Sequence, residues 1–369
     1  MSGYVRPLTL PPHYDPKNCY LADYSHPDTR VLMDAALVWR GQNGLTPVGN
    51  DEVIINVTAI DNQRDFVFPP PYGTLFVGGR SGTGAMDDQA RAMAFMYKYM
   101  GIITEINNTL DTHVVFQVFF GCAHLNKDGK NPAPYTQISA DEYRRGDYRP
   151  NPEMAAQLGV DPVWLQKQFI YYCEQLESTG RYKLTIWPDH CLLGTPGHQL
   201  TGVMNEMRMF HAWARGANNR LEVKGGNPLT EHYSVFKPEV MTTWDGQAIP
   251  GAQKNVEFLR RLMGLSGQHA RKNKRVINIL WGQALSHCVA WAIDDFLVEI
   301  NAQDPSLLKT VYILEDCSSP VCVPNPDVPG AFYVDFTPEG QAALDRFRNA
   351  GMNVVKSTDP IESWPNIQL

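Results

Sequence analysis

An Asp-x-His pair and a distant histidine form the first group of residues that could do chemistry. Asp111 and His113 stand in "DTH", and His190 stands in "WPDHCLLGTPG". One carboxylate oxygen and two imidazole nitrogens suit a divalent metal such as zinc, iron or manganese. Three protein ligands leave positions open for water and substrate, as in a functional metal site. A single Asp-x-His also occurs by chance in many proteins, so the pair alone leaves both interpretations open.

An acid, a lysine and a cysteine form the second group, and together they suit covalent catalysis. Asp61 follows the strand candidate 52–60, Lys224 follows the strand candidate "NRLEV" (219–223), and Cys288 lies in the first turn of a helix after the strand candidate 275–282. A carboxylate accepts a thiol proton, a nearby ammonium favours both anions, and a helix N-terminus favours a thiolate. Each residue also has an ordinary structural role, as a turn cap, a solvated lysine or a small buried apolar side chain. Their joint position after strands favours the catalytic interpretation.

Strands alternating with helices are expected to bring both groups to one edge of a sheet. β-branched, nearly continuous apolar runs predict buried strands at 52–60, 275–282, 310–316 and 353–357. Two further segments, 102–110 and 182–187, are weaker strand candidates. Helical spacing or composition predicts helices near 28–40, 87–100, 162–178, 198–215, 286–303 and 338–351. We therefore predict an α/β fold with a doubly wound, Rossmann-like parallel sheet, helices on both faces, and ligands at the carboxyl ends of the strands.

Composition suggests one main domain with two additions. We expect residues 1–50, rich in Pro, Asp and Tyr, to form an N-terminal extension packed on the body. The main domain would span residues 51–369. It would carry a long insertion at about 120–180, which begins with a stretch rich in Gly, Pro, Asn and Asp.

The overall chemistry of the chain limits its partners and its compartment. A net charge of −7 gives no reason to expect nucleic acid or an anionic membrane as a partner. No apolar run approaches the roughly 18–20 residues that span a bilayer, and the first residues lack the apolar core of a secretion signal. Seven cysteines without a CxxC pair favour a reducing compartment. We expect a cytoplasmic protein with a small-molecule substrate, and leave open whether it forms a homo-oligomer.

Five motifs together resemble the nicotinamidases of the cysteine-hydrolase superfamily that also contains the isochorismatases. The motifs are "DNQRDF" (61–66), "DTH" (111–113), "WPDHCLLGTPG" (187–197), "KGGNPLTEHYS" (224–234) and "GQALSHCV" (282–289). They occur in the order of the family, and the resemblance spans roughly residues 52 to 357. The most specific string is Trp-Pro-x-His-Cys-x-x-Gly-Thr, which accompanies the metal-dependent nicotinamidases.

The resemblance implies a metal-dependent hydrolysis of nicotinamide to nicotinic acid and ammonia. Asp61, Lys224 and Cys288 would be the catalytic triad, with a thioester on the cysteine as the intermediate. The residues Asp111, His113 and His190 would hold one divalent ion, with Zn²⁺ expected before Fe²⁺ or Mn²⁺.

The resemblance also implies the surroundings of the reacting amide. Phe66, Trp187 and Tyr233 would pack on the substrate ring. The backbone N–H groups of Leu285 and Cys288 would form the oxyanion hole, with a cis peptide bond between Ala284 and Leu285.

Two alternatives remain open at this point. The same nucleophile could act on another small amide or a carbamoyl compound, because residues at the rim and in the insertion determine the substrate. The chain could also be a non-catalytic member that binds a ligand. Retention of the whole triad argues against the second alternative.

Overall fold

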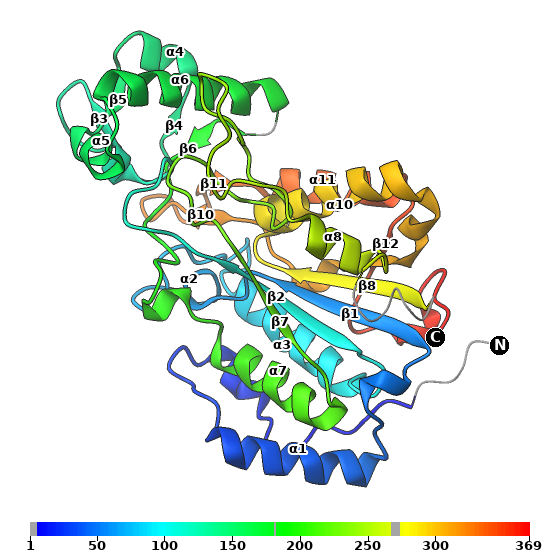
Figure 1. The fold of residues 1–369 in the computed structure, drawn as a ribbon. Helices are drawn as coiled ribbons and strands as arrows, with labels where there is room; N and C mark the ends of the chain where they lie inside the picture. Colours follow the sequence, from blue (N-terminus) through cyan, green and yellow to red (C-terminus); the bar gives the residue numbers. More distant parts are fainter. Residues whose placement is uncertain (1–5, 181, 267–273) are drawn as a thin grey trace.

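The computed structural model describes residues 6–180, 182–266 and 274–369, and a six-stranded parallel sheet forms its centre (Figure 1). The order across the sheet is β12–β9–β8–β1–β2–β7, and every neighbouring pair is parallel. The strands are β1 (Val53–Ile60), β2 (Glu105–Asp111), β7 (Arg220–Lys224), β8 (Arg275–Gly282), β9 (Val311–Leu314) and β12 (Asn353–Val355). The predicted α/β fold is confirmed, and the ambiguous segment 102–110 provides most of strand β2.

The chain reverses its direction of winding between β1 and β8. From β1 the chain proceeds outward to β2 and β7, and from β8 it proceeds the other way to β9 and β12. The two central strands end together, because Ile60 is paired with Gly282. In open α/β sheets, the crevice at such a switch point, beyond the carboxyl ends of the strands, is where ligands bind.

Helices cover both faces of the sheet (Figure 1). On one face lie α1 (Thr29–Asn43), α3 (Gly84–Lys98) and α7 (Gly202–Arg215). On the other lie α8 (Val256–Leu262), α10 (Ala290–Gln303) and α11 (Thr337–Ala350). Side chains alternate along β8, with Ile279 in the first core and Leu280 in the second. Both faces are therefore buried, which explains why the strands read as continuous apolar runs.

The predicted extension contributes helix α1, which packs against α7. Its residues 1–5 lie outside the described residues. No helix in the part of the chain that the structure describes is long and apolar enough to cross a membrane.

The segment between β2 and α7 forms a separate small layer beside the carboxyl ends of the sheet (Figure 1). It contains helices α4 (Ala140–Arg144), α5 (Pro152–Leu158) and α6 (Pro162–Thr179). Two short antiparallel pairs join β3 (His124–Asn126) to β5 (Tyr148–Pro150) and β4 (Gln137–Ile138) to β6 (Leu184–Thr185). Helix α6 matches the prediction for 162–178.

The structure corrects the role of the segment 182–187. It contributes only the two-residue strand β6, which pairs with β4 and does not join the central sheet. The reason is that β7 already occupies the free edge of β2. The remaining elements are the short helix α2 (Arg64–Val67) and the hairpin of β10 (Cys322–Pro324) and β11 (Phe332–Asp335).

Candidate active site

Lys224 lies at the centre of a buried polar cluster at the switch point. Its Nζ is 2.9 Å from Oδ2 of Asp61 and 3.0 Å from Oδ1 of Asp111. It also donates to the carbonyl oxygen of His232 at 2.8 Å and lies 3.7 Å from Sγ of Cys288. Because Asp111 and Lys224 are paired at the ends of β2 and β7, the sheet itself sets this contact. The structure thus brings the three predicted triad residues together.

Burial and charge together determine the protonation of this cluster. Burial disfavours the charge on Lys224, but the carboxylates of Asp111 and Asp61 outweigh it and raise the pKa of the lysine. Burial raises the pKa of Asp61, and the nearby lysine partly opposes this. Burial also raises the pKa of the Cys288 thiol well above its usual value, again against the effect of Lys224. The resting thiol is therefore protonated and needs a base.

Asp61 is in position to be that base. A carboxylate oxygen of Asp61 and Sγ of Cys288 lie within 4.8 Å of each other. Asp61 has the left-handed φ of +49°, and its backbone N–H donates to Oγ1 of Thr109 at 3.0 Å. The Thr109 hydroxyl in turn donates to the Asp61 carboxylate. Strand β2 thus fixes a strained aspartate at the end of β1.

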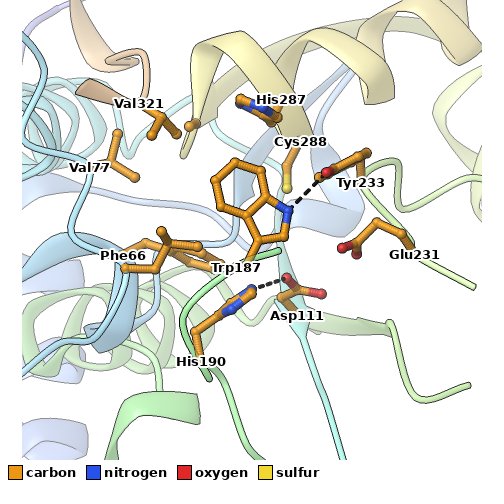
Figure 2. A pocket seen from close by; sticks show the side chains of 12 residues that line it. Phe66, Val77, Asp111, Trp187, His190, Glu231, Tyr233, His287, Cys288 and Val321 are labelled. Atoms are coloured by element: carbon orange, nitrogen blue, oxygen red, sulfur yellow. Dashed lines mark hydrogen bonds and ion pairs between the residues drawn. The ribbon is translucent and has the colours of Figure 1, made fainter. Parts of the chain in front are cut away.

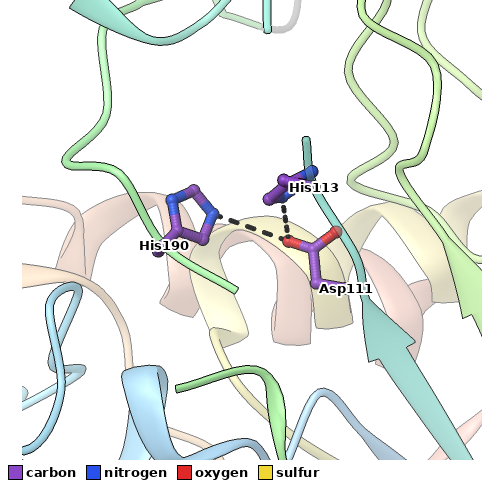
Figure 3. A group of neighbouring side chains, drawn as sticks. All are labelled: Asp111, His113 and His190. Carbon is purple, nitrogen blue, oxygen red and sulfur yellow. Dashed lines mark ion pairs between the residues drawn. The ribbon is translucent and has the colours of Figure 1, made fainter. Parts of the chain in front are cut away.

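Asp111, His113 and His190 converge beside this cluster (Figure 3). Oδ2 of Asp111 lies 3.0 Å from Nε2 of His113 and 3.6 Å from Nε2 of His190. The Nδ1 atoms face backbone carbonyl oxygens, of Gly225 at 3.2 Å and of Pro188 at 2.8 Å. A carbonyl can only accept, so each Nδ1 carries the hydrogen and each Nε2 is free for a cation. A backbone carbonyl that accepts from the other ring nitrogen is typical of metal-binding histidines.

The donor set fits a divalent cation. Burial lowers the pKa of His113, so the ring is neutral. Its Nε2 makes no hydrogen bond within the described residues, and its lone pair faces a carboxylate oxygen of Asp111. A cation between these two electron-rich atoms would stabilise both of them. A Cβ atom at Gly225, where φ is +90°, would come within 2.8 Å of Asp111 and His113, so the backbone is also shaped around this group.

His190 reaches the site through the loop after β6. The His113 N–H donates to the carbonyl of Cys191 at 3.0 Å, and the Leu193 N–H donates to the carbonyl of His113 at 3.0 Å. Cys191 is buried, and its N–H donates to Oδ2 of Asp65 at 2.6 Å. These hydrogen bonds between two loops hold His190 at the site. The sequence analysis expected a strand of the central sheet at 182–187 to position it.

Cys288, Asp111 and His190 line one cavity (Figure 2). Its lining residues are Phe66, Leu75, Val77, Asp111, Trp187, His190, Glu231, Tyr233, Ala284, His287, Cys288 and Val321. The indole N–H of Trp187 donates to the hydroxyl of Tyr233 at 2.9 Å. The cavity therefore has largely aromatic and apolar walls with a few polar groups, which suits a small flat ligand. All three aromatic residues proposed from the sequence line it.

Among the lining residues that the sequence analysis missed, two have titratable side chains, His287 and Glu231. His287 directly precedes the cysteine, and its ring packs against Trp187 and Tyr233. Glu231 precedes Tyr233 by two residues. Both residues lie next to or near a motif residue in the sequence, which could have suggested them. Such proximity does not show which side chains point into the cavity.

The backbone near the thiol differs from the prediction by one residue. The N–H of Leu285 donates to the carbonyl of Ser319 at 2.8 Å, so it is not available as an oxyanion donor. The cis peptide bond joins Gln283 to Ala284, not Ala284 to Leu285. Both predictions are therefore wrong. The N–H of Ala284 makes no hydrogen bond to any residue that the structure describes, and Ala284 lines the cavity.

The thiol itself occupies the expected position at a helix start. Cys288 lies in a single π-helical turn (Leu285–Val289) that leads directly into α10. Backbone N–H groups at such a start favour an anion.

Comparisons with known proteins find similarity at the level of structure only. No protein-family model matches the sequence, and no curated protein matches it. The yeast nicotinamidase structure is 17% identical, covers 82% of this chain and 99% of its own, and gives a TM-score of 0.46. An Acinetobacter baumanii nicotinamidase/pyrazinamidase is 16% identical, with coverages of 83% and 97% and a TM-score of 0.44.

A third similar structure is a Pyrococcus horikoshii pyrazinamidase in complex with zinc. It is 16% identical, with coverages of 82% and 98% and a TM-score of 0.38. Similarities of this size do not show a function for this chain.

Proposed function

We propose that the chain is a metal-dependent cysteine amidohydrolase that converts nicotinamide to nicotinic acid and ammonia. The observation that carries this proposal is the single ammonium of Lys224, which contacts Asp61, Asp111 and the Cys288 sulfur. A structural role alone does not require a buried acid and a buried lysine beside a thiol that lines a cavity with aromatic walls. The arrangement matches the demands of nucleophilic catalysis by an activated thiol.

In the first step, Asp61 accepts the proton of the Cys288 thiol and the sulfur attacks the amide carbonyl carbon. The ammonium of Lys224 stabilises the carboxylate of Asp61 before this transfer and the thiolate of Cys288 after it. The N–H groups of Ala284 and Cys288 are the proposed donors to the oxyanion, because Ala284 offers an unpaired N–H at the cavity wall. Asp61 then returns its proton to the leaving nitrogen, and ammonia departs.

In the second step, water attacks the thioester carbon and the carboxylic acid leaves. Asp61, again a carboxylate, accepts the proton of the water, and the released sulfur recovers a proton. Phe66, Trp187 and Tyr233 hold the ring and exclude bulk water from the reacting carbon.

Asp111, His113 and His190 would hold the metal ion. When bound, the ion supplies a Lewis-acid position for the ring nitrogen of the substrate. One oxygen and two nitrogen ligands fit Zn²⁺, and they also accept Fe²⁺ or Mn²⁺.

The test is an ammonia-release assay on nicotinamide, pyrazinamide and a panel of small amides, with metal analysis of the same preparation. We expect release from nicotinamide that requires Cys288 and is lost with a chelator. Ammonia release from another amide, with none from nicotinamide, would support the cysteine amidohydrolase chemistry and replace nicotinamide as the proposed substrate. No release from any amide would contradict the proposal.

A further inference from the structure

The proposed mechanism leaves one polar group of the cavity unused, the carboxyl of Glu231. This side chain is buried, with only 3% of the residue exposed, and it lines the same cavity as Cys288 (Figure 2). Its Oε1 accepts a hydrogen bond from the N–H of His232 at 2.9 Å. Its Oε2 has no hydrogen bond and no ion pair within the described residues.

The other carboxyl oxygens around the thiol all have partners. Those of Asp61 contact Thr109 and Lys224. Oδ1 of Asp111 contacts Lys224, and Oδ2, which faces His113 and His190, would be a ligand of the proposed metal ion. The free oxygen of the site is therefore on Glu231. Buried polar atoms without partners are rare in proteins, and at a ligand cavity the bound molecule is the natural partner.

The predicted insertion contacts the backbone of Glu231 through helix α6. The N–H of Glu231 donates to the hydroxyl of Tyr172 on α6 at 3.2 Å. The carbonyl of Glu231 accepts from the N–H of Glu239 at 2.9 Å. A second, narrow cavity between α6 and this loop is lined by Glu231 and Tyr233 as well. The loop is thus a thin wall, with the active cavity on one side and the insertion on the other.

We propose that the amide N–H of the substrate donates a hydrogen bond to Oε2 of Glu231, so that Glu231 selects amides over esters. Tyr172 is the positioning residue for this contact. When the sulfur of Cys288 attacks the carbonyl carbon, the amide nitrogen is one bond from the reacting carbon, in the cavity that Glu231 and Cys288 both line. An ester carries an oxygen without hydrogen at that place and cannot donate. The inference rests on the function proposed above and identifies the residue through which the cavity would recognise an amide substrate.

The test compares nicotinamide with methyl nicotinate, because attack by Cys288 converts both to the same thioester. Glu231→Met should lower kcat/KM for the amide about 10-fold and leave the ester unchanged, as expected for one lost hydrogen bond. Glu231→Gln should give the same result. The N–H of His232 would keep the amide oxygen of Gln at the Oε1 position, which turns the NH₂ group, a donor, toward the substrate.

Variants on α6 test the positioning role. Tyr172→Phe should lower the amide-to-ester ratio about 3-fold, because it removes the acceptor for the Glu231 N–H and keeps the ring. Tyr171→Phe is the matched control on the same helix, where the lost hydroxyl contacts Thr242 at 2.8 Å. This control should leave the ratio unchanged. A loss in stability alone would lower kcat/KM equally for both substrates and would leave the amide-to-ester ratio unchanged.

Equal losses for amide and ester in Glu231→Gln, or no loss, would overturn the inference while the proposed function stands. If the wild-type protein hydrolyses neither compound, the proposed function fails, and calorimetric binding to Cys288→Ala decides the inference instead. In the Cys288→Ala protein, adding Glu231→Gln must weaken the binding of nicotinamide and leave the binding of methyl nicotinate unchanged. An equal effect on both ligands, or no effect, would overturn it.

Discussion

Replacing Lys224 by methionine tests the electrostatic centre of the site. The change keeps the apolar stem and removes the ammonium, which is 2.9 Å from Asp61 and 3.0 Å from Asp111. Both aspartates are buried, at 0% and 3% exposure, so their charges would lose their shared partner. Removing one partner of a buried ion pair costs about 3–5 kcal/mol. That is a large part of the about 5–15 kcal/mol that stabilises a typical domain.

The assay is urea unfolding of the wild-type and Lys224→Met proteins at pH 7, with a chelator present so that no cation compensates the charge. The matched control is Lys254→Met, which breaks an ion pair with Glu299 whose side chains are 39% and 16% exposed. An exposed pair contributes only about 0–1 kcal/mol. We expect a loss of several kcal/mol in the first variant and less than about 1 kcal/mol in the second.

The pH dependence of the loss in unfolding free energy gives an independent check on the role of Lys224. In the wild-type protein, burial opposes the charge on Asp111, but the ammonium of Lys224 helps to hold its pKa well below the usual value. That carboxylate contributes stability above its unfolded-state pKa of about 3.9 and loses it as the pH falls further. Without the lysine, burial raises both aspartate pKa values, so the penalty of the variant grows as the pH rises above 3.9. The difference between the proteins should shrink from pH 7 to pH 5. A loss below about 1 kcal/mol at pH 7, or a difference that widens toward pH 5, would refute the reasoning.

Three further changes test other parts of the site. Asp61→Asn removes the base and should lower kcat by about 10²–10⁴-fold at pH 7; a decrease smaller than 10-fold would exclude this role. His190→Ala should lower metal affinity by more than the about 10–100-fold typical of outer-shell changes, measured as metal content after dialysis, while His26→Ala on the extension should not. Gly225→Ala should weaken metal binding, because its Cβ would meet Asp111 within 2.8 Å at a φ of +90°, whereas Gly226→Ala, with no atom within 4 Å, should not. Equal metal content in the two glycine variants would contradict that packing argument.

The sequence was sufficient for the parts of the site that the sheet positions. Asp111 and Lys224 end parallel strands and Asp61 directly follows one, and the carboxyl ends of parallel strands meet at one edge. Runs that are apolar on both faces are visible without a structure, so β1 and β8 could be predicted together with the residues that follow them.

The errors concern contacts that loops and single backbone groups decide. The segment 182–187 has strand composition, but its partner β4 lies in the insertion, and composition does not identify a partner. Whether Leu285 or Ala284 offers a free N–H depends on the carbonyl of Ser319, which comes from a distant loop. Glu231 was missed because no periodic pattern in its loop indicates which side chains are buried.

The central claim is that Cys288 forms a thioester with the acyl group of the amide in this cavity. The most direct measurement is mass spectrometry of the acid-quenched protein during turnover of nicotinamide or its methyl ester, followed by peptide mapping. The account predicts one added nicotinoyl group on the peptide that contains Cys288, and none in Cys288→Ala. Turnover with no adduct in the wild-type protein, together with full activity of Cys288→Ala, would contradict it.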